Sequence, residues 1–381
     1  MIRVCEAVLP GHPDKFCDQI ADAIVAAASA VEPDAYCQTE VCAWSNEVFL
    51  TGGIATRAPF TADLGALVRR VAREVGYCGG NWIDGDRYRV TDTICRVVAD
   101  PTRWTRHVND QSIVVGHAWG DARTHYLPPE TFLAHAFRRA LTDACRDGEL
   151  RGEGPDGKLL VRMRLEGGDS RARSAVRLRL EHVLVTLQHR EETEVLDLAE
   201  RVAACLGLAY AQLADGDGRW CEPWSTVDLD VNPNGPLLNG GSDGDNGQTG
   251  RKLVMDYYGP HVPIGGGALS GKHLTHIDRL GACAARHAAV RAVAGGAGEC
   301  TIRVAYAPNV AVPLEVTCEM SPRGPRAPRE FFDFDAMADR YASAEIDSSL
   351  ARGDHFFDLS RPWNRDEPQR LVVTRSHCSG Q

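Results

Sequence analysis

The sequence predicts an α+β protein made of three similar units of helix and sheet packed around a pseudo-threefold axis. The order helix, hairpin, helix occurs three times along the chain, but no sequence period is exact, so architecture is repeated rather than sequence. Hairpins with helices on one side are typical of α+β layers, and 381 residues are enough for two or three domains. We place the domains at residues 1–98, 108–222 and 223–381.

Composition narrows the class of protein. Hydrophobic residues make up 44% of the chain and charged residues 25%, which is ordinary for a soluble globular protein. The formal net charge of -10 disfavours a nucleic-acid binder, and the absence of a long apolar run predicts no membrane span. The 13 cysteines include no C-x-x-C pair. We therefore expect reduced thiols in a cytoplasmic protein, and no zinc site at Cys37 and Cys42.

The first unit opens with a helix N-terminus. Pro13 suits the first turn of a helix, and Asp14 suits its positive end. The apolar stripe that follows consists of Phe16, Ile20, Ile24 and Ala27. His12, Asp14 and Lys15 then lie where a helix commonly meets phosphate, although His12 alone also fits a cap or a surface residue.

The remaining elements follow from periodicity and turn residues. In the first unit we expect a hairpin over residues 36–56, turning at Ser45 and Asn46, and a helix over 62–76. For the second unit the expected elements are a helix over 129–146, strands over 159–166 and 174–187 around a turn at 167–169, and a helix over 192–207. For the third unit they are a helix over 277–294, strands over 300–307 and 314–319, and a helix over 328–341. Residues 214–223 are a polar break, and 343–381 a partly ordered tail with a frayed end.

A glycine-rich stretch over residues 228–278 organises the chain. It contains two glycine clusters that end in cations, the first at Arg251 and Lys252 and the second at Lys272. Backbone N–H groups of glycine together with such cations form concave anion sites, and carboxylates beside a polyphosphate usually hold Mg²⁺. The carboxylates of the stretch are Asp243, Asp245, Asp256 and Asp278. The pattern favours an ordered phosphate cradle over a flexible surface loop.

The second cluster nearly matches a P-loop, with Gly266, Gly271 and Lys272 at the required spacing. The next residue is His273 instead of the Ser or Thr that would place a hydroxyl on Mg²⁺, and the compact strand, loop and helix context is missing. The sequence therefore argues against an ATPase of the Walker type.

Six motifs in order along the chain resemble those of the S-adenosylmethionine synthetases, also called methionine adenosyltransferases. The motifs are GHPDKFCDQIADA at 11–23, DQS at 110–112, PDGK at 155–158, QHREE at 188–192, GDNGQTGRK at 244–252 and GGGALSGKH at 265–273. The resemblance covers nearly the whole chain and implies the threefold α+β fold described above. It also implies attack of methionine sulfur on C5′ of ATP, release of tripolyphosphate and its hydrolysis. Two Mg²⁺, one K⁺ and a homodimer or dimer of dimers would accompany this reaction.

The resemblance further assigns roles by position. His12 stabilises charge as the C5′–O bond breaks, Lys158, Arg251, Lys252 and Lys272 neutralise the phosphates, and Asp156 and Asp245 orient the nucleoside. The expected metal ligands are Asp14 and Asp278 for Mg²⁺ and Glu40 for K⁺. The other expected ATP-binding positions are Lys15, Thr186, Leu237, Ala268 and His276. The expected positions on the methionine side are Ile54, Asp110, Asp245 and Pro308.

The departures from the family concentrate on the methionine side. Ile54 stands where the family has a glutamate for the methionine amine, and residues 99–109 form a shortened loop without the family's Gln-Gly dipeptide. Leu237 replaces the aromatic residue that stacks on adenine, Pro308 an aliphatic residue near the methionine side chain, and His276 a phosphate-side lysine. If His276 takes over from lysine, tripolyphosphatase activity should fall as pH rises through histidine titration.

These departures leave alternatives open. A divergent branch could solve the same methionine contacts differently, or a methionine analogue could be the preferred acceptor, since an unreplaced buried carboxylate costs a few kcal/mol. A regulatory paralogue that joins an active synthetase, or a plain triphosphatase, would belong to another class. The full set of cationic and acidic residues disfavours the regulatory paralogue.

Overall fold

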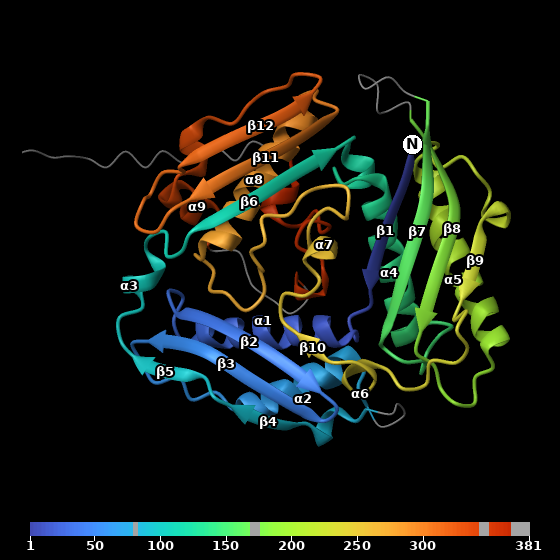
Figure 1. Ribbon diagram of the computed structural model, residues 1–381, viewed down its shortest axis with the longest axis horizontal. Helices are drawn as coiled ribbons and strands as arrows, with labels where there is room; N and C mark the ends of the chain where they lie inside the picture. Colours follow the sequence, from blue (N-terminus) through green and yellow to red (C-terminus); the bar gives the residue numbers. More distant parts are fainter. Residues whose placement is uncertain (79–82, 168–175, 343–349, 367–381) are drawn as a thin grey trace, which may run out of the picture.

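The computed structural model describes residues 1–78, 83–167, 176–342 and 350–366. They form three separate sheets whose inner faces are covered by helices. Figure 1 shows the sheets surrounding a central region that holds the loops of the glycine-rich stretch, next to helix α1 (Pro13–Val31). The α+β class and the three-unit architecture are confirmed.

The first sheet is built on the expected hairpin. Strands β2 (Tyr36–Trp44) and β3 (Glu47–Thr56) pair antiparallel and turn at Ser45, which has φ of 50°. The other strands are β4 (Arg89–Asp92) and β5 (Cys95–Val98), parallel to β3, and β10 (Gly247–Gln248), antiparallel to β2. Helices α1 and α2 (Leu64–Val75) enclose a core of their own against this sheet.

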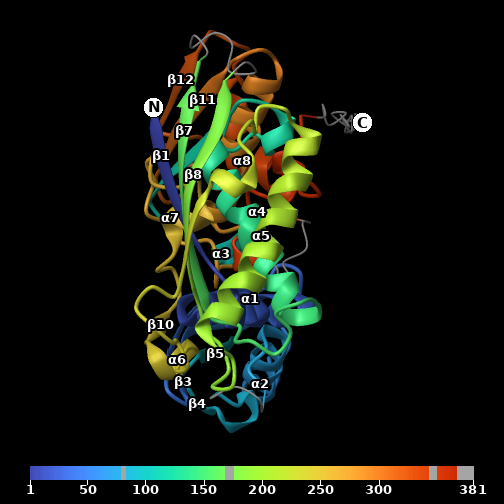
Figure 2. The ribbon, with the colours of Figure 1, turned by 90° about the vertical axis from the view of Figure 1, so that its right-hand side faces the viewer.

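The other two sheets share a second core. One sheet has the order β1 (Ile2–Val8), β7 (Gly157–Glu166), β8 (Arg177–Leu187), β9 (Asp228–Val231), with helices α4 (Pro129–Asp147) and α5 (Val195–Gly216). The other has the order β12 (Glu315–Ser321), β11 (Glu299–Tyr306), β6 (Ser112–Trp119), with helices α8 (Ile277–Ala294) and α9 (Phe334–Tyr341). Figure 2 shows β1, β7 and β8 on one side of the molecule and α4 and α5 on the other.

The sheets exchange strands between distant parts of the chain. β1 pairs with β7, β6 with β11, and β10 with β2. The division into contiguous domains at 1–98, 108–222 and 223–381 therefore does not coincide with the sheets, because strands from different sequence units complete one another.

Most expected elements lie within a few residues of their predicted bounds, and two differ. The helix expected over 192–207 extends to Gly216 and so enters the predicted polar break. The helix expected over 328–341 is divided at Asp333 into a 3₁₀ turn and α9.

The short elements are α3 (Thr102–Thr105), α6 (Gly241–Gly244), α7 (Leu253–Asp256), η1 (Gly85–Arg87), η2 (Ala122–Thr124), η4 (Trp224–Thr226), η5 (Arg329–Phe332), η6 (Leu350–Arg352) and η7 (Pro362–Asn364).

Part of the tail is held by a buried arginine. The Arg286 guanidinium on α8 donates to the carbonyls of His117, His125 and Phe356 and to Asn364 Oδ1. This network docks the segment that carries Trp363, which is 4% exposed. The frayed end expected beyond residue 366 and most of the turn expected at 167–169 lie outside the described residues.

In the part of the chain that the structure describes, no helix combines the length and the apolarity needed to cross a membrane.

Candidate active site

A row of three aspartates on α1 holds the glycine-rich stretch. Asp14, Asp18 and Asp22 are four residues apart, so their carboxylates lie along one face of the helix. Each carboxylate accepts one backbone N–H from the glycine-rich stretch at 2.9 Å. The three donors are Gln248, Gly250 and Gly271. One helix face thus fixes both glycine clusters.

The second cluster also rests directly on β2. Gly271 has φ of +82°, and a Cβ there would approach Thr39 O to 2.2 Å. Thr39 N donates to Gly271 O at 2.8 Å, and Gln38 pairs with Lys272 as an isolated bridge. Glycine is required at 271 because both the backbone conformation and the close approach exclude a side chain.

Each aspartate of the row also pairs with a cation. Asp14 pairs with Lys252, Asp18 with Lys15, and Asp22 with Arg279. Asp18 and Asp22 are almost completely buried. Burial raises the pKa of each of these two carboxyls to about 6, and the neighbouring cations oppose that rise.

Lys15 does not fit the ATP-binding role expected from the sequence. Its side chain is fully buried, with Nζ at 2.9 Å from Asp18 and 2.6 Å from Asp256. Burial alone would lower the pKa of Lys15, but these two carboxylates outweigh burial and raise it. The ammonium therefore points into the protein, where it neutralises the carboxylates beneath the glycine clusters.

Two helix N-termini carry the same constellation. His12 caps α1 by accepting the N–H of Asp14 at Nδ1, and Asp14 pairs with Lys252. His276 caps α8 by accepting the N–H of Asp278 at Nδ1, and Asp278 pairs with Lys272 at 2.6 Å. In both places an aspartate two residues after the capping histidine meets the lysine at the end of a glycine cluster.

Both capping histidines are neutral at physiological pH. Burial, helped by the Lys252 ammonium, lowers the pKa of His12 to about 4. Burial also lowers the pKa of His276 to about 4. Since Nδ1 accepts in each ring, the proton is assigned to Nε2, which becomes a donor. The titration of His276 near neutral pH, expected if it replaced a lysine charge, does not fit this environment.

Other expected ATP-side residues gather near His12. Asp245, Lys158 and Lys252 are close enough to His12 to affect its pKa. Asp156 Oδ2 accepts the N–H of Gly241 at 2.7 Å, and burial raises the pKa of Asp156 to about 6. Lys158 is half exposed and pairs with Glu6 at 2.7 Å.

The remaining ATP-side positions lie on neighbouring strands and loops. Thr186 lies opposite Lys158 across β7 and β8, and Leu237 O accepts the N–H of His189 at 3.0 Å. Arg251 Nε lies 3.6 Å from Asp14 Oδ1. A Cβ on Gly250 would come within 3.0 Å of Ala268 Cβ, so the two glycine clusters touch.

The expected metal ligands fit a polyphosphate site. Among the described residues, no three His, Cys, Asp or Glu side chains form a metal-binding group. Mg²⁺ bound with a polyphosphate commonly uses only one or two carboxylates, so single carboxylates at Asp14 and Asp278 match that donor set. Partial burial raises the pKa of Glu40, the expected K⁺ ligand, and the nearby Lys272 ammonium opposes the rise.

The methionine-side role expected for Ile54 is contradicted by its orientation. Ile54 is 1% exposed and belongs to the core under the first sheet. Since alternate side chains of a strand face opposite sides, Gly53 is the position that faces away from this core. A Cβ on Gly53 would lie in ordinary van der Waals contact with Tyr36 Cε1 at 3.7 Å and Cys95 O at 3.9 Å, so a methyl group fits there without a clash.

Sequence reasoning missed a row of neighbouring aromatic rings beside Gly53. The ring of Tyr36 lies 5.6 Å from Trp104 and 5.2 Å from His273, whose ring lies 5.3 Å from His276. Trp104, 37% exposed, comes from the shortened loop. The available signal for this row was a tryptophan in a loop that departs from the family. The rings that it joins lie far away in the sequence, so the sequence alone does not show that they are neighbours.

Asp110 and Pro308 are exposed at the same end of the molecule. Burial, Cys37 and Asp110 raise the pKa of Tyr36, so Asp110 lies near the aromatic row. Asn309 N donates to Val108 O at 2.9 Å and brings the turn with Pro308 beside the segment with Asp110.

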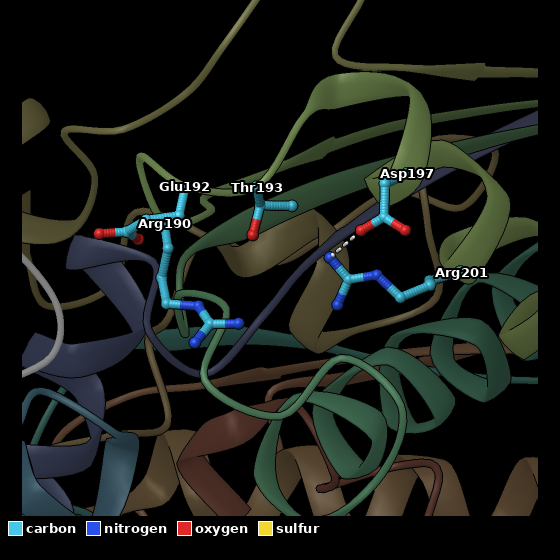
Figure 3. Close-up of a pocket in the computed structure, with 5 residues that line it drawn as sticks. All are labelled: Arg190, Glu192, Thr193, Asp197 and Arg201. Atoms are coloured by element: carbon cyan, nitrogen blue, oxygen red, sulfur yellow. Dashed lines mark ion pairs between the residues drawn. The ribbon is translucent and has the colours of Figure 1, made fainter.

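The QHREE motif lines a shallow, polar pocket, and Figure 3 shows the Asp197–Arg201 ion pair in it. Glu153, whose side chain is fully buried, accepts from Arg190, Arg201 and Thr193 there. Because the buried Glu153 carboxylate already pairs with both arginines, these residues have a structural role.

Comparisons with known proteins show the family of the chain. A model of the S-adenosylmethionine synthetase N-terminal domain matches residues 1–97, and one of the C-terminal domain matches 239–330. The chain is 34% identical over 331 residues to S-adenosylmethionine synthase of Methylobacterium radiotolerans, covering 84% of this chain and 80% of that protein. It is 33% identical over 336 residues to that of Clostridium botulinum, with coverage of 82% and 81%. An unusual S-adenosylmethionine synthetase from Campylobacter jejuni has the same fold, with a TM-score of 0.83 and 24% identity over 96% of this chain and 97% of that one.

The aspartate row leads to a stability prediction. Asp22→Ala leaves the Arg279 cation without its carboxylate and the Gly271 N–H without its acceptor. We expect a loss of about 3–5 kcal/mol in unfolding free energy, as for other broken buried pairs. Asp63→Ala, which removes only the exposed cap of α2, should cost about 1 kcal/mol. Urea denaturation of both variants measures the difference, and equal losses would contradict a buried anchoring role for Asp22.

Proposed function

The chain belongs to the S-adenosylmethionine synthetase family, and on that premise we propose that it joins ATP to L-methionine at the two helix N-termini. It is a methionine adenosyltransferase. The sulfur lone pair forms the S–C5′ bond, the C5′–O bond breaks, and its electron pair leaves with tripolyphosphate, which is then hydrolysed. One observation supports placing the reaction at these helix ends: at each glycine cluster a neutral histidine donor lies beside an aspartate that pairs with a lysine.

His12 donates a hydrogen bond to the oxygen that leaves C5′. Its Nδ1 is fixed by the N–H of Asp14, so Nε2–H points away from the helix end as a donor. A neutral donor held in place stabilises the negative charge that develops on this oxygen without being repelled by Lys252. The lowered pKa of about 4 keeps the imidazole in this form.

The cations match a leaving group of high negative charge. Lys252 and Lys272 end the two glycine clusters, Arg251 adjoins the first, and Lys158 lies close enough to affect the pKa of His12. We assign Mg²⁺ to Asp14 and Asp278 and K⁺ to Glu40; bound Mg²⁺ would supply further positive charge to the phosphates. ATP binding would also involve Asp156, Thr186, Leu237, Asp245, Ala268 and His276.

A second copy of the chain is the proposed partner. Large apolar side chains are exposed on strands of all three sheets, among them Ile2, Phe49 and Ile113. Such exposure supports association through the sheet faces as a homodimer or a dimer of dimers. The cysteines of the described residues are free thiols, which supports a cytoplasmic location.

The activity is tested by mass spectrometry of products from ATP, Mg²⁺, K⁺ and L-methionine. We expect the mass of S-adenosylmethionine, with turnover reduced about 10²- to 10³-fold in His12→Asn, because asparagine caps the helix but lacks the Nε2 donor. His12→Ala should lose the cap as well and lower thermal stability. An unchanged rate in His12→Asn would contradict the donor role. No adenosylated product from the wild-type protein would contradict the proposed reaction and favour a regulatory or triphosphatase role.

A methionine analogue with a larger S-alkyl group is the second candidate acceptor. The partly exposed ring of Trp104 and the lack of a side chain at Gly53, beside Tyr36, favour it. An extra methylene in an apolar pocket changes kcat/KM by roughly 10- to 200-fold. If this candidate is correct, S-ethylhomocysteine should equal or exceed methionine in kcat/KM, and Gly53→Val, which adds side-chain volume beside Tyr36, should restore preference for methionine. A strong preference of the wild-type protein for methionine would rule this candidate out.

A further inference from the structure

A cavity of about 570 Å³ is lined by residues of α2 and α4 and by no residue of the glycine-rich stretch. Its walls come from the C-terminal ends of α2 and α4, the loop after α4, and η6. None of the residues assigned above to ATP, methionine or metal lines it. This size is typical of pockets for small organic molecules.

The cavity combines an apolar surface with a cationic rim. Its apolar lining includes Leu9, Pro10, Val75 and Pro155. Four arginines also line it, Arg73, Arg146, Arg151 and Arg352, and are called the rim arginines below. Four arginines from separate segments therefore surround one apolar cavity, in a chain whose formal net charge is -10.

The carboxylates at the cavity do not cancel this charge. Glu153 is engaged by Arg190 and Arg201, and Glu74 pairs with Arg70 at 3.1 Å. Each of these carboxylates is thus balanced by arginines other than the four of the rim. Three other aspartates, Asp86, Asp143 and Asp147, pair with Arg73 and Arg146, so among the described residues the positive charge left without an ion pair lies at Arg151 and Arg352.

The rim arginines are accessible to a ligand in different degrees. Arg73 and Arg146 pair with exposed aspartates, and such surface ion pairs are weak enough to exchange. Arg151 takes part in none of the ion pairs found among the described residues. Arg352 uses Nε for Gln19 Oε1 at 3.0 Å, and its terminal nitrogens have the planar geometry that binds carboxylate or phosphate.

We propose that this cavity is a binding site for an organic anion, a small molecule with a carboxylate or phosphate group on a flat apolar body. The anionic group would lie between Arg151 and Arg352, and the apolar body against Pro10 and Val75. Gln19, which accepts from Arg352, also donates to Pro10 O at 2.8 Å, so the site adjoins the segment that leads to His12. The binding is independent of the proposed reaction.

The test uses anilinonaphthalene sulfonate, an aromatic anion whose fluorescence rises in apolar sites, with a non-hydrolysable ATP analogue filling the nucleotide site. Two variants perturb the cavity in different ways: Arg151→Gln with Arg352→Gln removes charge, and Thr142→Trp fills volume while keeping all four arginines. Arg323→Gln, an exposed arginine beyond β12, is the matched control. Thermal unfolding confirms that each variant is folded.

We expect each cavity variant to weaken probe binding about tenfold or more, and the control to bind like the wild-type protein. Displacement of the probe by phenyl phosphate or by benzoate then tells which anionic group the site prefers. Probe affinity within twofold of wild type in both cavity variants, or no saturable binding to the wild-type protein, would overturn the proposal.

Discussion

The active-site geometry depends on the aspartate row of α1. Asp14, Asp18 and Asp22 each accept a backbone N–H from the glycine-rich stretch and each pair with a cation. Glycine-rich backbone has little side-chain surface to bury, so packing alone would not hold it in one conformation. Charge-assisted hydrogen bonds to a rigid helix supply that order. This arrangement buries all three carboxylates, and the paired cations Lys252, Lys15 and Arg279 offset the cost of that burial.

The same row explains how two distant helix ends form one site. Asp14 lies in the first turn of α1, so the row that fixes both clusters starts beside His12. The second cluster continues from Gly271 to Lys272, which pairs with Asp278 at the start of α8. Both ends then carry a neutral capping histidine and an aspartate paired with the lysine of a glycine cluster. This distribution suits a triphosphate, whose charge extends over several ångströms and is expelled as a unit.

Much of the fold was predictable because most elements form from local patterns. The hairpin over residues 36–56, the helix Leu64–Val75 and the helix Ile277–Ala294 follow from alternation, amphipathic spacing and a helix-starting position. The strands Ile2–Val8 and Ser112–Trp119 were missed, because they are completed by partners 150 or more residues away. Long-range pairing also joins strands from different sequence units into one sheet.

The site was predictable in its residue types but less so in their orientations. Among the motif residues, Asp14 pairs with Lys252 next to His12, and Asp278 pairs with Lys272. Lys15 is one residue from Asp14, yet that single step turns its ammonium into the protein instead of toward the site. Ile54 and Gly53 differ in the same way, since a shift of one residue in a strand exchanges the two faces.

The central claim is that α1 holds both glycine clusters through its aspartates. Hydrogen–deuterium exchange of Asp22→Ala tests it most directly. The account predicts faster exchange in peptides over residues 265–273, which lose the Asp22 anchor, and little change over 244–252, which Asp14 and Asp18 still hold. Unchanged exchange at 265–273, or equal acceleration of both segments, would contradict it.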